Sequence, residues 1–224
     1  MDITPTPLPG VLILTPRRFS DDRGFFAEVW RDTTLAEHGI EIGFVQDNQS
    51  LSRQTGTVRG LHYQAPPHAQ AKLVRVGQGA VWDVAVDARR GSPHYGRWTG
   101  VKLSAANGRQ LLVPSGFLHG FVTLTPECEL LYKCSDRYAP AADGAIHFAD
   151  PGLGIDWGIA PDRALLSAKD AAAPGFGDWQ SPFDYTGPFP WEERYPAPPV
   201  EAAPKTNAKL SAEPNAGAAA ELRP

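Results

Sequence analysis

Short strand-like segments separated by turn residues fill most of the chain, and this pattern constrains the fold more than any other feature. Several segments alternate between apolar and polar side chains, as Val84 to Asp87 do. Many short strands with closely spaced turns are typical of an all-β sandwich or barrel. We therefore expect antiparallel strands within 11–14, 24–30, 72–76, 80–89, 100–104, 109–114, 121–125 and 129–134.

Helices are expected to be few and short. Glycine and proline contribute 22 residues each to a chain of 224, about a fifth, whereas about 12% is average. Only two windows favour a helix. One covers 33–38 and is stopped by Gly39, and a second, shorter one begins near Asp162.

The composition divides the chain into two parts. Residues 1–186 read as one globular domain. Residues 187–224 contain eight prolines and nine alanines and few large apolar side chains. Such a segment buries too little apolar surface to offset the entropy of ordering, so we expect a disordered tail. The aromatic residues between Phe183 and Trp191 could still pack on the domain, and a proline-rich partner motif is the alternative.

Charge and hydropathy exclude several classes of function. The formal net charge is -4, which gives no general attraction for nucleic acid or for an anionic membrane. No apolar run approaches the roughly 20 residues that span a bilayer. The first ten residues lack a basic segment followed by an apolar one, so a cytoplasmic location is expected.

The two cysteines are expected to be free thiols. Cys128 and Cys134 lie six positions apart in one predicted strand, which corresponds to roughly 20 Å when extended. A disulfide requires Cα atoms within about 7 Å.

The segment GRQLLVPSGFLHGF, residues 108–121, predicts a strand, a tight turn and a return strand that carries a histidine. Pro114 and Gly116 supply the restricted and permissive backbone angles that the turn requires. This spacing is typical of a double-stranded jelly roll of the cupin type, with His119 pointing into the barrel. A turn followed by an ordinary core histidine is the alternative.

A metal-binding cupin would also need a His-x-His pair and a nearby glutamate. The matching segment, GLHYQAPPHAQAKL at 60–73, has Gln64 in place of the second histidine and Lys72 where a ligand could lie. A divalent metal needs three or four nitrogen or oxygen ligands, and a lysine cation opposes one. We therefore expect a pocket without metal, and we expect His68, beside two prolines, to lie in a loop.

Four remaining side chains suit proton transfer next to a ketone: His62, Lys72, His119 and Tyr132. A histidine can remove such a proton if a nearby cation stabilises the enolate, and a tyrosine can return one. A packing role for the tyrosine and a solvated lysine are the ordinary alternatives. Arg23, Arg59 and Lys169 could bind a diphosphate, and Phe26 and Tyr138 could stack on a base.

Eight strings occur in order along the chain: DDRGFFAEVW, FVQDN, VRGLHYQ, AKLVRV, VWDVAVDAR, VPSGFLHGFVTL, LLYKCSDRYAP and LSAKDAAAP. Together, over roughly residues 3–180, they resemble the dTDP-4-dehydrorhamnose 3,5-epimerase family. The resemblance implies a cupin jelly roll and a homodimer that exchanges N-terminal strands. It also implies cofactor-free inversion of C3 and C5 in dTDP-4-dehydro-6-deoxy-D-glucose, on the route to dTDP-L-rhamnose.

The resemblance also implies roles for individual residues. His62 would be the base, paired with Asp170, while Lys72 would stabilise the enolate and Tyr132 would donate a proton. The implied substrate contacts are Arg23, Phe26, Glu28, Gln46, Asp47, Asn48, Arg59, His119, Tyr138, Asp143 and Lys169. Arg23, Phe26 and Glu28 would serve the pocket of the neighbouring subunit.

Two features depart from the family pattern: Asp143 stands where a glutamate is usual, and the tail after Gly187 has no counterpart in typical short members. Three alternative functions follow from the same residues. They are a C3-only epimerase, a metal-dependent cupin oxygenase or isomerase, and a cupin module that binds a sugar nucleotide without reaction.

Overall fold

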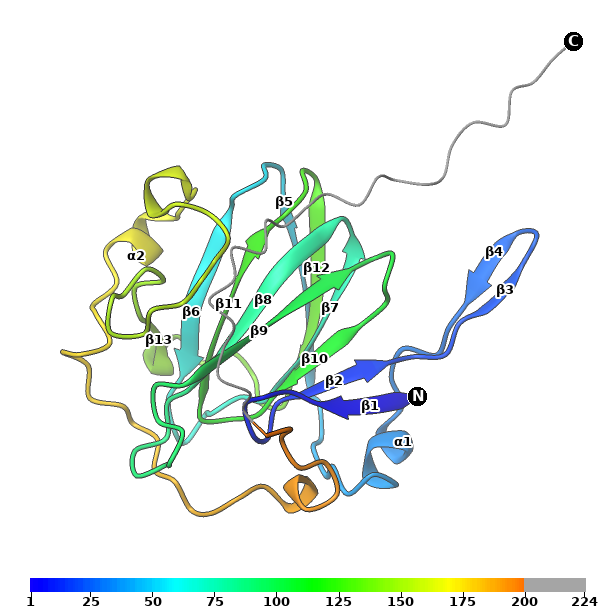
Figure 1. The fold of residues 1–224 in the computed structure, drawn as a ribbon, viewed down its shortest axis with the longest axis horizontal. Coiled ribbons are helices and arrows are strands. Elements are labelled where there is room, and N and C mark those ends of the chain that lie inside the picture. The colour runs from blue at the N-terminus through cyan, green and yellow to red at the C-terminus, as the bar shows by residue number, and fades with distance from the viewer. Residues whose placement is uncertain (200–224) are drawn as a thin grey trace, which may run out of the picture.

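Two antiparallel β-sheets face one another and form the body of the protein (Figure 1). The computed structural model describes residues 1–199. The larger sheet contains, in spatial order, β1 (Asp2–Pro5), β2 (Leu12–Thr15), β10 (Gln110–Val113), β7 (Lys72–Gln78), β12 (Cys128–Cys134) and β5 (Gln46–Ser52). The smaller sheet contains β13 (Asp143–Ala145), β6 (Val58–Gln64), β11 (Phe117–Thr123), β8 (Ala80–Asp87) and β9 (Trp98–Ser104). The predicted all-β architecture is confirmed.

The helical elements within the described residues are short. They are α1 (Asp32–Ala36), α2 (Ala168–Ala171) and the 3₁₀ turns η1 (Pro140–Ala142), η2 (Pro161–Arg163) and η3 (Pro190–Glu192). The helix predicted at 33–38 corresponds to α1. The one predicted near Asp162 is only the 3₁₀ turn η2.

Both faces of the smaller sheet are covered, which explains why strands such as β8 and β11 are apolar on both sides. Side chains such as Val74, Leu111 and Phe121 fill the space between the sheets. The outer face of the smaller sheet packs against Phe148, Trp157 and neighbouring residues. All seven residues of β11 are consequently buried.

The hairpin formed by β3 (Phe19–Asp21) and β4 (Gly24–Phe26) projects from the body (Figure 1). Its rings are exposed, with Phe25 at 59% and Phe26 at 71% of their full accessible area. The strand predicted at 24–30 is therefore too long, because its partner β3 offers only three residues for pairing.

The folded part of the chain extends past the boundary predicted at residue 186. Trp191 is buried, and its Nε1 donates a 3.0 Å hydrogen bond to the carbonyl oxygen of Gly10. Phe189 lies with its ring centroid 4.7 Å from the guanidinium carbon of Arg89. Trp191 is buried and Phe189 is partly buried, so the aromatic residues up to Trp191 pack on the domain, and the folded part continues beyond the boundary predicted at residue 186. The rest of the predicted tail, from Val200 onward, lies outside the described residues.

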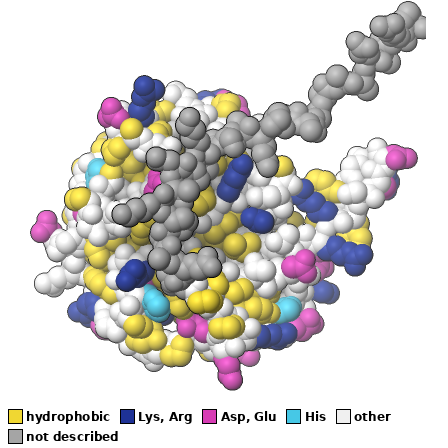
Figure 2. All heavy atoms as spheres, viewed as in Figure 1, with side chains coloured by type: hydrophobic (Ala, Val, Ile, Leu, Met, Phe, Trp, Pro, Cys, Tyr) yellow, Lys and Arg dark blue, Asp and Glu magenta, His cyan; other side chains and the backbone are white. Residues whose placement is uncertain are grey.

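Cys128 and Cys134 begin and end β12, and both are buried free thiols, as predicted. No helix within residues 1–199 is long and apolar enough to cross a membrane. Acidic and basic side chains are interspersed on the face of the molecule shown in Figure 2, without a large area of one sign.

Candidate active site

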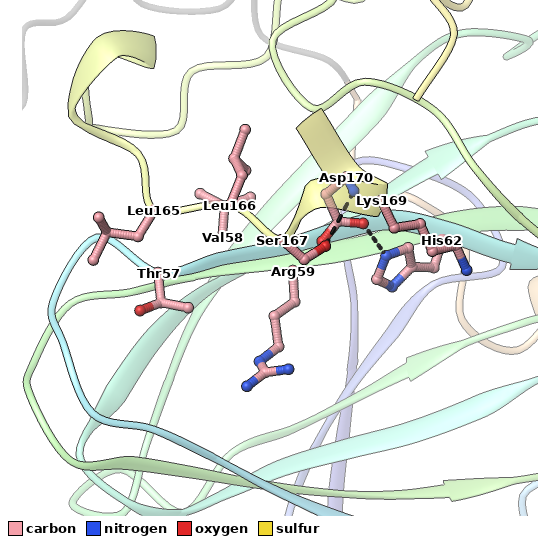
Figure 3. A pocket seen from close by; sticks show the side chains of 9 residues that line it. All are labelled: Thr57, Val58, Arg59, His62, Leu165, Leu166, Ser167, Lys169 and Asp170. Atoms are coloured by element: carbon pink, nitrogen blue, oxygen red, sulfur yellow. Dashed lines mark hydrogen bonds and ion pairs between the residues drawn. The ribbon is translucent and has the colours of Figure 1, made fainter. Parts of the chain in front are cut away.

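A cleft opens at the polar end of the space between the sheets. It consists of two adjoining cavities of about 400 and 320 Å³, which have His62 and Lys169 in common. The larger cavity is lined by Gln46, Asn48, His62, Tyr63, Gln64, Gln70, Lys72, Tyr132, Tyr138, Asp143 and Lys169. The smaller is lined by Thr57, Val58, Arg59, His62, Leu165, Leu166, Ser167, Lys169 and Asp170 (Figure 3).

The pairing of β6 with β11 places two histidines side by side at this end. His62 lies opposite His119 in the antiparallel register, and the register shifts directly afterwards. The strands approach closely there: a Cβ atom added to Gly60 would lie 2.6 Å from the Cα atom of Gly120. Gly60 also has a φ of +123°, which residues with a side chain rarely adopt. Glycine at this position therefore permits the approach.

His62 is paired with Asp170 across the wall of the cleft (Figure 3). Its Nε2 lies 2.6 Å from Oδ1 of Asp170, while the imidazole remains 32% exposed and the carboxylate only 4%. With Nε2 protonated and donating to the carboxylate, Nδ1 keeps a lone pair for accepting a proton. The pair that the resemblance implied is thus in hydrogen-bond contact.

The short helix α2 fixes the position of Asp170. Oγ of Ser167 accepts a 3.1 Å hydrogen bond from the backbone N–H of Asp170 and caps the helix. Burial alone would raise the pKa of the Asp170 carboxyl, but hydrogen bonds from His62, Ser167 and the backbone of Gly60 hold it below its ordinary value. The carboxyl is therefore ionised at neutral pH.

A second His–Asp pair lies deeper. Nε2 of His119 is 2.9 Å from Oδ1 of Asp83, and the two side chains are 8% and 0% exposed. His119 does not line either cavity. It lies on the strand next to His62 and is buried away from the open space.

Lys72 and Tyr132 face the larger cavity from the opposite sheet. Burial lowers the pKa of the Lys72 ammonium, and the nearby Cys134, Asp83 and Asp143 act to raise it. Burial raises the pKa of the Tyr132 hydroxyl, so it carries its proton at neutral pH. The two side chains lie across the cleft from His62, where a substrate between the sheets would contact all three.

Contacts of Asp143 join two segments that border the cleft. Its Oδ2 accepts hydrogen bonds from the ammonium of Lys169 and from the hydroxyl of Tyr138, the latter at 3.2 Å. Oε1 of Gln46 accepts from the backbone N–H of Tyr138 at 2.8 Å. The Asp143 carboxylate thus links the β12–β13 connection to α2.

Two other predicted residues line the walls. Asn48 lies on β5 and its Nδ2 contacts Sγ of Cys134 at 3.6 Å. Arg59 extends from β6 and donates to Oγ of Ser52 at 3.2 Å, which leaves part of its guanidinium exposed in the smaller cavity.

Four predicted substrate contacts lie elsewhere in this chain. Arg23, at the turn of the hairpin, is 90% exposed and pairs with Asp21. Phe26, on β4, and Glu28, which follows this strand and pairs with Arg31, lie outside both cavities. Asp47 points to the outer face of the larger sheet, where it binds Lys133 at 2.8 Å. Strand alternation explains this, since its neighbours Gln46 and Asn48 take the inner face.

Sequence reasoning did not single out Asp83, Ser167 or Gln70. Asp83 could have been found as a carboxylate at an inward position of an otherwise apolar strand. Ser167 precedes the helix three residues before Asp170, which is the spacing of an N-cap. Gln70 lies in an irregular loop, for which the sequence pattern holds no signal.

The side chain of Gln64 is fully used in holding a loop. Its Nε2 donates to the carbonyl oxygens of His68 and Arg137, and its Oε1 accepts from the backbone N–H of Ala139. His68 lies in the β6–β7 loop and pairs with Asp136 at 3.1 Å. Within residues 1–199 there is no group of three or more His, Cys, Asp or Glu side chains arranged to hold a metal ion.

Comparison with known proteins identifies the family. The family model described as dTDP-4-dehydrorhamnose 3,5-epimerase matches residues 5–178. A protein of that name from Salmonella typhimurium is 50% identical over 175 residues, covering 78% of this chain and 94% of the relative.

Solved structures agree with this match. An epimerase from Legionella pneumophila, in complex with dTDP-4-keto-L-rhamnose, is 43% identical with a TM-score of 0.79, covering 83% of this chain and 99% of that one. A 3'-monoepimerase from Streptomyces bikiniensis, in complex with dTDP-quinovose, is 36% identical with a TM-score of 0.71, covering 78% and 87%. With the family model matching most of the domain, the chain belongs to the dTDP-4-dehydrorhamnose 3,5-epimerase family.

Proposed function

We propose that this protein inverts C3 and C5 of dTDP-4-dehydro-6-deoxy-D-glucose and releases dTDP-4-dehydro-β-L-rhamnose. The observation that carries the proposal is that His62, backed by Asp170, faces the same cleft as Lys72 and Tyr132. The relative from Legionella pneumophila, solved with dTDP-4-keto-L-rhamnose, supports the choice of substrate class.

The first step is removal of a proton from carbon beside the C4 ketone. Nδ1 of His62 takes the proton, and the electron pair of the broken C–H bond moves onto the ketone oxygen to form an enolate. The imidazolium is stabilised by the Asp170 carboxylate. The Lys72 ammonium stabilises the negative oxygen by charge and hydrogen bond.

The second step returns a proton from the opposite face. At C5 the Tyr132 hydroxyl donates to the carbon, and the enolate reverts to the ketone. Tyr132 then regains a proton from solvent while His62 releases one, so the net reaction is an isomerisation. Because the same ketone acidifies both neighbouring carbons, His62 and Lys72 serve C3 and C5 in turn.

The diphosphate and the nucleoside would bind toward the smaller cavity and the mouth. Arg59 and Lys169 are the cations on these walls, and Arg guanidinium groups match phosphate oxygens well. Arg23, Phe26 and Glu28 project away from their own cleft. We propose that they complete the cleft of a second copy in a homodimer.

Hydrogen exchange in heavy water tests the activity. The purified protein is incubated with dTDP-4-dehydro-6-deoxyglucose in D₂O, and deuterium at C3 and C5 is followed by NMR, with and without a chelator. Incorporation at both carbons, insensitive to the chelator, is expected. Incorporation at C3 alone would indicate a monoepimerase, and loss with chelator would indicate a metal enzyme. Absence of exchange with tight binding would indicate a binding module.

A complementation experiment tests the shared site. Arg23→Ala and His62→Ala proteins, each inactive by itself, are mixed and allowed to exchange subunits. Half of the dimers are then mixed, and one of their two sites has neither defect, so about a quarter of wild-type activity should return. No recovery after demonstrated subunit exchange would contradict the shared site.

A further inference from the structure

The deeper His–Asp pair leaves one carboxylate oxygen without a partner. Oδ1 of Asp83 is bound to His119, but Oδ2 is buried and has no hydrogen-bond partner among residues 1–199. The side chain is 0% exposed. A buried, half-satisfied carboxylate is costly unless a positive charge lies nearby. The hydrogen bond to His119 alone therefore does not explain why a carboxylate is buried at this position.

Lys72 is a cation that lacks a partner in residues 1–199. Its ammonium makes no hydrogen bond or ion pair within the described part of the chain, whereas Lys133 pairs with Asp47 and Lys169 with Asp143. Lys72 begins β7 in one sheet and Asp83 lies on β8 in the other. Burial lowers the pKa of the Lys72 ammonium, and the charge of Asp83 is among those that oppose this effect.

The other groups that face Lys72 are already engaged or neutral. Asp143, on β13, binds Lys169 and Tyr138. Burial raises the pKa of the Cys134 thiol on β12, so it is uncharged at neutral pH. The remaining titratable or charged groups around this space are Tyr132 on β12, His62 and Arg59 on β6, and His119 on β11. Asp83 is thus the uncommitted negative charge within this set.

We propose that Asp83 is a positioning residue: its Oδ1 orients His119, and its Oδ2 is the counter-charge of the Lys72 ammonium. The role of that ammonium at the enolate rests on the proposed function, but the pairing of charges does not. Asp83 touches no substrate in this arrangement and acts through Lys72 and His119.

The test is the neutral, nearly isosteric variant Asp83→Asn. Lysine Cε labelled with ¹³C reports the titration of each ammonium by NMR, and the Lys72→Arg protein identifies the Lys72 signal by its absence. In Asp83→Asn the measured pKa of Lys72 should fall by about one unit or more. The alkaline limb of the kcat profile should move to lower pH by the same amount, while KM changes little.

Asp87→Asn is the matched control. Asp87 lies on the same strand and on the same face, and it is equally buried, but Arg89 and Ser92 occupy both of its oxygens. Its replacement should destabilise the fold without shifting the Lys72 titration. An equal shift of the Lys72 signal in both variants would show that the shift comes from a general loss of packing, and it would overturn the proposal.

Further outcomes distinguish a failure of the counter-charge role from a failure of the proposed function. An unchanged Lys72 titration in folded Asp83→Asn would overturn the counter-charge role. If that variant does not fold, Asp83→Ser carries the same expectation. Should the wild-type protein show no proton exchange with substrate, the proposed function fails, but the titration of Lys72 without ligand still decides the role of Asp83.

Discussion

The two His–Asp pairs contain the same residue types but differ in their access to the cleft. His62 is 32% exposed and lines both cavities, whereas His119 is 8% exposed and lines neither. A base must present a nitrogen to the substrate, so only His62 can exchange a proton with it directly. The buried pair can orient groups and supply charge. Identical chemistry thus takes two roles because of position alone.

The two carboxylates also reach their histidines by different routes. Asp83 sits on β8, which pairs with the strand that carries His119. Asp170 comes from α2, 108 residues beyond His62 in the sequence. The inner pair is therefore built into the sheet, while the outer pair depends on a short capped helix. Changes near α2 should therefore act mainly on activity, whereas changes on β8 should act mainly on the stability of the fold.

The largest expected effect comes from removing the exposed histidine. His62→Ala should lower the rate of C3 deuterium exchange by about 10³-fold or more, because the imidazole held by Asp170 is the base that removes the proton. His119→Gln should cost less, about 10-fold, and act partly through the geometry of its neighbours. NMR exchange rates with saturating substrate measure both. Equal losses in the two variants would contradict the assignment of the base.

Tyr132→Phe tests the side chain that lies across the cleft from the outer pair of His62 and Asp170. Loss of the donor should slow reprotonation at C5 by about 10²-fold while His62 still exchanges the C3 proton. Separate rates for C3 and C5 by NMR provide the measurement. Tyr95→Phe, a surface change away from the cleft, is the control. An equal decline at both carbons would argue against a specific role at C5.

Acid should weaken the outer pair through Asp170. Its pKa is held below the ordinary value, so its contribution is complete above about pH 4 and disappears as the pH falls through the native pKa. Asp170→Asn should therefore lower the free energy of unfolding by about 2 kcal/mol at pH 6, and the difference from wild type should shrink below pH 4. Urea unfolding at several pH values measures this. Asp47→Asn, an exposed surface carboxylate, should show a much smaller difference, and a gap that widens in acid would refute the expectation.

The smallest effect is expected at the helix cap. Ser167→Ala removes the acceptor for the backbone N–H of Asp170 and should cost about 1 kcal/mol of stability. Ser167→Thr, which keeps the hydroxyl, should restore most of it. Thermal unfolding of the two variants gives the comparison. If alanine and threonine behave alike, the cap does not hold the outer pair in place.

Much of the fold was predictable because the strands carry strong apolar patterns. The turn at Pro114 to Gly116 and the inward histidine of β11 occur as predicted, and Gly116 has a φ of +89°. The strand β5 shows why other elements escape such reasoning. Its inward residues Gln46, Asn48 and Ser50 are polar, since they line a cleft rather than a core, so hydrophobic alternation is absent.

The pairing of His62 with Asp170 was predictable from the resemblance rather than from spacing. His62 and Asp170 are separated by 108 residues, and no local pattern brings them together. Asp83 was missed because strand alternation places it inward but does not show what it faces. The positions of Arg23 and Phe26 depend on how the hairpin leaves the body, which is determined by contacts that local sequence does not contain.

The three hydrogen bonds of Gln64 have an evolutionary consequence. A metal-binding relative would need a histidine at this position, but an imidazole cannot supply two donors and one acceptor to His68, Arg137 and Ala139. Such a replacement would release the loop that carries Tyr138 before binding of a metal could compensate for the lost hydrogen bonds. A substitution of Gln64 toward a metal-binding site would therefore lower the order of this loop before the metal site is complete.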